Sequence, residues 1–143
     1  MNKIEKFQGT TRWLSNFEPC NVVFDGETYP SVEHAYQAAK TLIVAERKKI
    51  KNCNRAGKAK KLGMTVTLRN DWTEERRIKT MYDLNLQKFS QKDLKEKLLA
   101  TGDSILEEGN TWGDQFWGIC KGSGRNELGK ILMKIRAELR NIA

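Results

Sequence analysis

Apolar residues along most of this chain recur with the spacing of α-helices. The clearest case is the C-terminal segment, where they stand three or four positions apart: Leu128, Ile131, Leu132, Ile135 and Leu139. This pattern predicts a helix over 126–141 with one apolar face. Weaker repeats predict further helices over 32 to about 45, 46–54, 56–62, 71–89 and about 90–100. In the segment 71–89, the candidates for the buried side are Trp72, Ile78, Met81, Tyr82, Leu84 and Phe89.

Residues with known preferences for helix ends mark several of these boundaries. Ser31 is a good N-cap for a helix that starts at the next residue. Ser90 with Asp93 resembles a capping box at the start of the helix that runs to about residue 100. Gly63 and Gly102 stand where two of the helices should end.

The remaining segments predict short strands. Residues 20–29 read as a hairpin around Asp25-Gly26, which is a strong two-residue turn signal. An earlier strand over Ile4–Phe7 is expected to pair with this hairpin. Other brief strands are predicted at 65–68, 105–107 and 116–120. The sequence therefore predicts an α+β fold, in which a single helix-rich domain over residues 1–143 carries a small sheet of short strands.

The helix that begins after Ser31 has one chemically mixed face. At about 100° per residue, Glu33, Tyr36, Gln37 and Lys40 share that face. A carboxylate, a phenol, an amide and an ammonium group together are typical of a binding or catalytic site. The alternative is that Glu33 only stabilises the helix N-terminus, where the dipole favours a negative charge.

Composition sets the broad class of the protein. Its 143 residues are 38% hydrophobic and 31% charged, as expected for one globular domain. No apolar run approaches the roughly 20 residues that span a membrane. The N-terminus lacks the apolar stretch of a signal peptide, so a cytoplasmic location without a membrane partner is expected.

Cysteine and histidine usage argues against a metal site. Cys20, Cys53 and Cys120 are far apart in the sequence, and His34 is the single histidine. A structural zinc site needs four ligands from this small supply, so no metal is expected. A Ser-His-Asp hydrolase would have to use His34, and the Gly-x-Ser-x-Gly motif is absent.

The formal net charge is +8, and much of the excess is local. Eight cationic residues fall within fifteen positions: Arg47, Lys48, Lys49, Lys51, Arg55, Lys58, Lys60 and Lys61. Such a surface either is simply solvated or attracts a large anionic substrate.

Two further segments combine aromatic, amide and charged residues, Arg12–Phe17 and Asn110–Gly118. In the second, Trp112 and Trp117 flank Asp114. Two tryptophans can stack a planar base while the carboxylate reaches its polar edge or the sugar. Alternatively, the tryptophans belong to the core and the aspartate caps a turn.

A glycine-rich stretch, Gly122–Gly129, leads into the last helix. Free backbone N–H groups there, together with Arg125, suit a phosphate. The spacing is that of neither a dinucleotide-binding fingerprint nor a P-loop. The alternative is that this loop is a plain turn.

Taken in order, these blocks resemble the NADAR family, also called YbiA-like, from Phe7 to Leu139. The matching blocks are Arg12–Phe17, Tyr29–Lys40, Asp71-Trp72, Lys88-Phe89, Leu99–Asp103, Trp112–Gly118 and Gly124–Arg136. The resemblance implies an N-glycosidase without a metal or other cofactor. It implies as substrates ADP-ribose-containing or ribose-phosphate small molecules, namely riboflavin-biosynthesis intermediates or ADP-ribosylated guanine. ADP-ribosylated DNA is a further candidate.

The residues then take the following roles as hypotheses. Cleavage of a C1′–N bond develops positive charge on the ribose, which Glu33 would stabilise, or Glu33 would activate water. Lys40 would hold a phosphate or a ribose hydroxyl, or attack C1′ itself, which requires a lowered pKa. Asp114 would orient water or protonate the leaving base.

The expected substrate-binding residues extend around these three. Trp112 or Trp117 would stack the base, and Gly124 with Arg125 would contact a phosphate. Arg12, Asn16 and Asn126 would hold ribose or phosphate oxygens. Tyr36 and Gln37 would bind the substrate from the same helix face as Glu33 and Lys40.

Two other classes of protein compete with the enzyme. A sensor or sink would bind ADP-ribose or NAD without turnover. A nucleic-acid-binding module, suggested by the charge alone, would show a steep salt dependence. Retained carboxylates beside an anionic ligand favour catalysis over binding alone.

Overall fold

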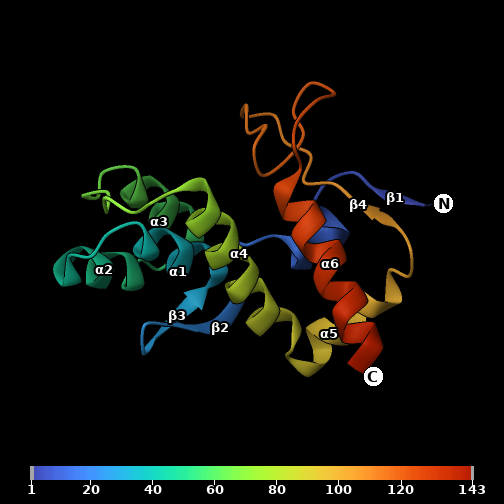
Figure 1. Ribbon diagram of the computed structural model, residues 1–143, viewed down its shortest axis with the longest axis horizontal. Helices are drawn as coiled ribbons and strands as arrows, with labels where there is room; N and C mark the ends of the chain where they lie inside the picture. Colours follow the sequence, from blue (N-terminus) through green and yellow to red (C-terminus); the bar gives the residue numbers. More distant parts are fainter. Residues whose placement is uncertain (1, 143) are drawn as a thin grey trace. The chain divides into compact units, whose positions relative to one another are not determined.

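The computed structural model describes residues 2–142 and has a helix-rich α+β fold with two small two-stranded sheets (Figure 1). Within these residues the backbone forms two compact units, 16–88 and 2–15 with 89–142. The prediction of one domain over 1–143 stays a prediction. Across the described stretch, every helix falls short of the length and apolarity needed to cross a bilayer.

The unit formed by residues 16–88 is built around helix α1. Its elements are β2 (Pro19–Phe24), β3 (Glu27–Ser31), α1 (Val32–Ala39), α2 (Val44–Lys51), α3 (Ala56–Gly63) and most of α4 (Glu74–Phe89). Helix α1 packs against α2, α3 and both strands of the hairpin, and Figure 1 shows it between α3 and the strands. All eight residues of α1 are buried. Its polar side chains therefore face protein rather than bulk water.

The hairpin is confirmed. Strands β2 and β3 pair antiparallel, and the turn residues Asp25 and Gly26 both have positive φ angles. The turn is held from outside as well, because Arg47 Nη1 donates to Asp25 Oδ2 at 2.8 Å.

The unit formed by 2–15 and 89–142 rests on the last helix, α6 (Glu127–Ile142), which lies within one residue of its predicted bounds. It buries Leu128, Ile131, Leu132, Ile135 and Leu139, as the apolar spacing predicted. The other elements are β1 (Lys3–Ile4), a 3₁₀ helix (Gly9–Leu14), α5 (Lys92–Ala100) and β4 (Ile105–Leu106). Gly102 has a φ of 61° and follows the end of α5, as predicted.

The first long helix is shorter than predicted. It ends at Ala39 rather than near residue 45, and α2 starts at Val44. The Lys40 carbonyl accepts the N–H of Arg69 at 2.8 Å instead of an N–H of a continuing helix. The Thr41 hydroxyl accepts the N–H of Ile43 at 3.1 Å, so the side chain replaces a helical hydrogen bond.

Several strand predictions were wrong, because these segments form their backbone hydrogen bonds with other parts of the chain than a sheet with the hairpin requires. Strand β1 pairs in parallel with β4, not with the hairpin. The segment 65–68 is irregular, and the Thr67 N–H bonds to Glu46 Oε1 at 2.9 Å instead of to a strand. The segment 116–120 forms only isolated bridges.

Two helix starts also differ from prediction. The N-cap of α5 is Gln91, one residue after the predicted Ser90. Helix α4 begins at Glu74 rather than at Asp71, because the Thr73 hydroxyl accepts the N–H of Arg76 at 3.2 Å and thereby opens the helix.

Candidate functional site

The start of α1 holds Glu33 in a fixed position. As predicted, Ser31 is the N-cap, and its hydroxyl accepts the N–H of His34 at 3.1 Å. The Glu33 N–H, which has no acceptor inside the helix, donates to the carbonyl of Asn16 at 3.1 Å. Only 7% of Glu33 is exposed. The first turn thus buries a carboxylate and satisfies the backbone around it.

Gln37 lies one turn further on and bonds directly to Glu33. Its Nε2 donates to Glu33 Oε2 at 2.6 Å, and only 5% of its surface is exposed. Its Oε1 is buried and has no hydrogen-bond partner among residues 2–142. The predicted helix face is therefore real, but on it Gln37 interacts with Glu33.

Lys40 is the last residue of the same face and the C-cap of α1. Burial lowers the pKa of Lys40, and the Glu33 carboxylate partly opposes this effect. The positive charges of Arg77 and Lys60 lower this pKa further. A lysine in this setting can bind an anion, and its neutral amine is more accessible than that of a surface lysine.

Tyr36, on the same face, packs against Trp72. The rings of Tyr36 and Trp72 are 5.5 Å apart and inclined at 56°, and Lys40 Nζ is 5.8 Å from the Tyr36 ring centre. Trp72 was expected on the buried side of a helix. It instead precedes α4 and packs on Tyr36. In the sequence, only the resemblance of Asp71-Trp72 to the NADAR family indicated that Trp72 lies near this helix face.

The buried Asn16 side chain, next to the start of α1, is hydrogen-bonded to two residues of α4. Its Nδ2 donates to Met81 Sδ at 3.3 Å, and its Oδ1 accepts from Asn85 Nδ2 at 3.3 Å. Asn85 is fully buried. Sequence reasoning missed Asn85, because a single polar residue inside a helix has no distinguishing pattern.

His34 serves the structure of this unit. Its Nδ1 lies 2.6 Å from Ser31 Oγ, and its Nε2 lies 2.9 Å from the carbonyl of Cys53. Burial lowers the pKa of His34, and the hydrogen bond to Cys53 opposes the shift. A neutral ring that donates from Nε2 and accepts at Nδ1 satisfies both contacts.

In the other unit, Asp114 organises a loop. Its Oδ1 accepts the N–H groups of Phe116 at 3.1 Å and of Trp117 at 2.9 Å. Asn110 brackets the same residue, since its Nδ2 donates to the Asp114 carbonyl at 2.8 Å and its Oδ1 accepts the Asp114 N–H at 3.0 Å. One carboxylate oxygen is thus committed to the backbone, while its catalytic role stays a prediction.

The aromatic residues of this loop form a small cluster. The rings of Phe116 and Trp117 meet edge to face at 4.7 Å, and the Arg125 guanidinium lies 4.7 Å from the Phe116 ring centre. Trp112 is 55% exposed. Its predicted stacking role, like that of Trp117, is not tested by this geometry.

The glycine-rich stretch is compact. Gly124 has a φ of 152°, and a Cβ there would collide with the Gly118 carbonyl. Asn126 is buried, and both ends of its amide bond to the backbone. These contacts explain the residue types by folding, and the predicted contacts with phosphate and ribose stay predictions.

The predicted residues fall into the two units. Asn16, Glu33, Tyr36, Gln37 and Lys40 belong to one, and Arg12, Trp112, Asp114, Trp117, Gly124, Arg125 and Asn126 belong to the other. Arg12 is exposed on the 3₁₀ helix. Between residues 2 and 142, no three His, Cys, Asp or Glu side chains are grouped to hold a metal ion.

Comparison with known proteins identifies relatives that match most of the chain. Residues 5–140 match the NADAR domain. A riboflavin biosynthesis protein of Vibrio vulnificus is 40% identical over 92% of this chain, which spans only 36% of that protein. An N-glycosidase of Nostoc punctiforme is 37% identical over 90% of this chain and 86% of its own length.

A solved structure is similar throughout. The NMR structure of the Escherichia coli protein YbiA superimposes with a TM-score of 0.84 at 31% identity, over 98% of this chain and 84% of that one. The curated sequence of the Escherichia coli protein, named N-glycosidase YbiA, is 35% identical over 88% of this chain and 80% of its length.

Proposed function

Because this chain belongs to the NADAR family, we propose that it is an N-glycosidase, a hydrolase that cleaves the bond between C1′ of a ribose and a base nitrogen. Relatives of similar length are named N-glycosidases. The observation that carries the proposal is the buried Glu33 carboxylate, oriented at 2.6 Å by Gln37 on a helix face that ends in Lys40.

In the proposed reaction, Glu33 acts where charge develops. As the C1′–N bond breaks, the ribose ring becomes cationic, and a buried carboxylate stabilises this charge more strongly than an exposed one. In the same position it can accept a proton from the attacking water. The rings of Tyr36 and Trp72, which pack against each other at 5.5 Å, would shield this reaction from bulk water.

Lys40 has two roles within the proposal. As an ammonium ion it holds a phosphate or a ribose hydroxyl of the substrate. Its lowered pKa also makes a neutral amine available, which can attack C1′ and displace the base. The resulting adduct would then be hydrolysed by water.

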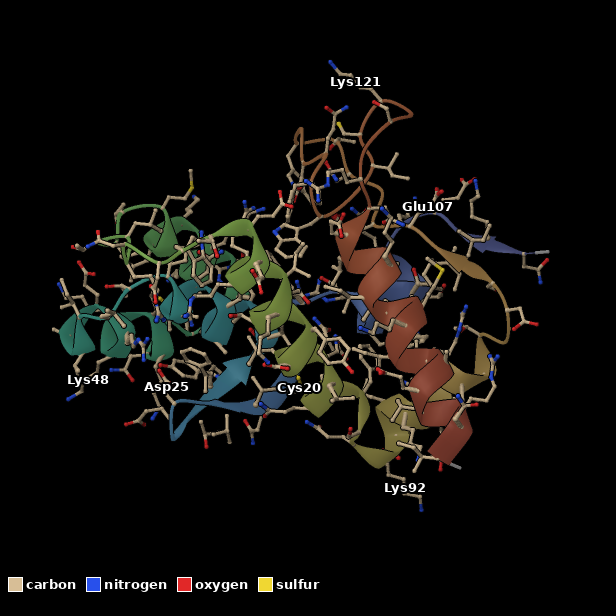
Figure 2. All side chains as sticks on the ribbon, viewed as in Figure 1. Cys20, Asp25, Lys48, Lys92, Glu107 and Lys121 are labelled. Carbon is tan, nitrogen blue, oxygen red and sulfur yellow. The ribbon has the colours of Figure 1, made fainter. Side chains whose placement is uncertain are left out.

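The proposed substrate is a phosphorylated or ADP-ribosylated nucleoside, either a riboflavin-biosynthesis intermediate or ADP-ribosyl-guanine, free or in DNA. The charge distribution supports an anionic substrate. Residues 40–69 contain ten Lys or Arg and one acidic residue, and all other residues contain sixteen and seventeen. The net charge of +9 in this segment exceeds that of the whole chain, and Lys48, labelled in Figure 2, is exposed.

A chromatographic assay tests the proposal. Purified protein is incubated with ADP-ribosylated guanosine and, separately, with a phosphorylated riboflavin precursor, alongside Glu33→Gln. We expect release of the base by the wild type, and a loss of about 100-fold or more in the variant. Binding without release over hours would favour the sensor or sink.

A further inference from the structure

We propose that Gln37 is a positioning residue that orients the Glu33 carboxylate, and that Gly63 of α3 exists to make room for it. This inference rests on the proposed function of Glu33. It replaces the expectation that Gln37 binds the substrate directly.

The geometry of the pair supports orientation. A glutamate side chain rotates about three bonds, and a buried one can adopt several rotamers. The Gln37 Nε2 donor, 2.6 Å from Glu33 Oε2, restrains the position of that carboxylate oxygen. Both residues lie on α1 four positions apart, so the helix itself sets their separation.

A neutral donor suits this position better than a cation. Lys40 on the same helix already acts on Glu33 electrostatically, and Lys60 and Arg77 act on Lys40. A further cation beside Glu33 would lower the basicity that the reaction needs. An amide supplies a hydrogen bond without net charge and does not titrate.

The Oε1 atom of Gln37 indicates that this side chain is not there merely to fill space in the core. Its Oε1 is buried and lacks a hydrogen-bond partner in the described chain. A buried acceptor without a partner reduces stability, and an apolar side chain of the same length would avoid that cost. The amide is therefore explained by what its Nε2 does.

Gly63 of α3 lies against the Gln37 side chain and leaves the space that this side chain occupies. A Cβ at this position would collide with Gln37 Oε1, and it would lie 2.6 Å from Gln37 Cδ and 2.9 Å from Gln37 Cβ. Gly57, on the same helix, is not constrained in this way, because its Cβ would lie 4.0 Å from Phe17. The two glycines provide a matched pair of variants.

The test compares Gln37→Met, Gly63→Ala and Gly57→Ala with the wild type. We expect kcat to fall by about 10- to 100-fold in the first two, because a shift of about 1 Å in a reacting group has effects of this size. KM should stay within about twofold, and Gly57→Ala should match the wild type. A rise in KM at unchanged kcat in Gln37→Met would instead make Gln37 a substrate ligand.

A second measurement does not depend on turnover. Carbon-13 NMR of labelled glutamate follows the titration of Glu33, with Glu33→Gln used to assign the signal. Loss of the donor in Gln37→Met should raise the pKa of Glu33 above its wild-type value, with Lys40 unchanged in both proteins. An unchanged titration would overturn the positioning role. An inactive wild type with the expected titration shift would refute only the proposed function.

Discussion

The side-chain amide of Asn126 joins the loop after β4 to the start of α6. Its Nδ2 donates to the carbonyl of Leu106 at 2.9 Å, and its Oδ1 accepts the N–H of Glu108 at 3.0 Å. Asn126 has a φ of 53°, a left-handed conformation that asparagine tolerates better than most residues. This residue therefore has a structural role whatever else it contacts.

Asn126→Ala should destabilise the fold. It removes both hydrogen bonds, one to the buried Leu106 carbonyl and one from the part-buried Glu108 N–H, at a cost of roughly 1 to 3 kcal/mol. Urea unfolding measures the change, with Lys92→Ala, an exposed residue on α5, as the control. Unchanged stability together with a raised KM would show that Asn126 serves the substrate instead.

Asp114 can be tested by separating its two possible contributions. Asp114→Asn retains Oδ1 as an acceptor for the N–H groups of Phe116 and Trp117, so its melting temperature should stay near that of the wild type. Asp114→Ala removes this acceptor and should cost about 1 kcal/mol, as loss of a helix cap does.

The activity of Asp114→Asn then tests the catalytic prediction. If the carboxylate orients water or protonates the base, kcat should fall by about 100-fold or more. Full activity in this variant would restrict Asp114 to holding the loop.

His34 should make stability depend on pH in a defined window. Because burial lowers its pKa, the unfolded chain takes up a proton first as the pH falls below about 6.5. The free energy of unfolding is therefore highest above this pH and declines until the folded protein is protonated as well.

Thermal unfolding between pH 7.5 and 5 measures this decline. His34 is the single histidine, so His34→Gln should flatten the curve just below pH 6.5. An equally steep curve in the variant would assign the dependence to other groups.

The cationic residues of segment 40–69 should contribute to the binding of large anionic substrates only. Lys48, Lys49 and Lys58 are exposed, so replacing all three with Ala should raise KM for an ADP-ribosylated oligonucleotide. The slope of log KM against log salt should decrease by about 2, since each phosphate contact with a single strand contributes roughly 0.7. KM for the free nucleoside should not change; an equal rise for both substrates would contradict a role in binding the longer one.

Much of the fold follows from local signals. Helix α6 and the β2–β3 hairpin were predicted because their apolar spacing and the Asp25-Gly26 turn lie within the segments themselves. The resemblance to the NADAR family was also contained in short blocks of sequence and is confirmed by the match over residues 5–140. The end of α1 was mispredicted, because it depends on a hydrogen bond from the distant Arg69.

By itself, the sequence determined that Glu33, Tyr36, Gln37 and Lys40 share a helix face, since helical periodicity requires only neighbouring residues. Tertiary structure decided what each of them contacts. The Gln37 amide can turn to Glu33 because Gly63 has no side chain in the way. Strand β1 pairs with β4, which lies about a hundred residues further along the chain. Such contacts arise from packing between segments that no local pattern connects.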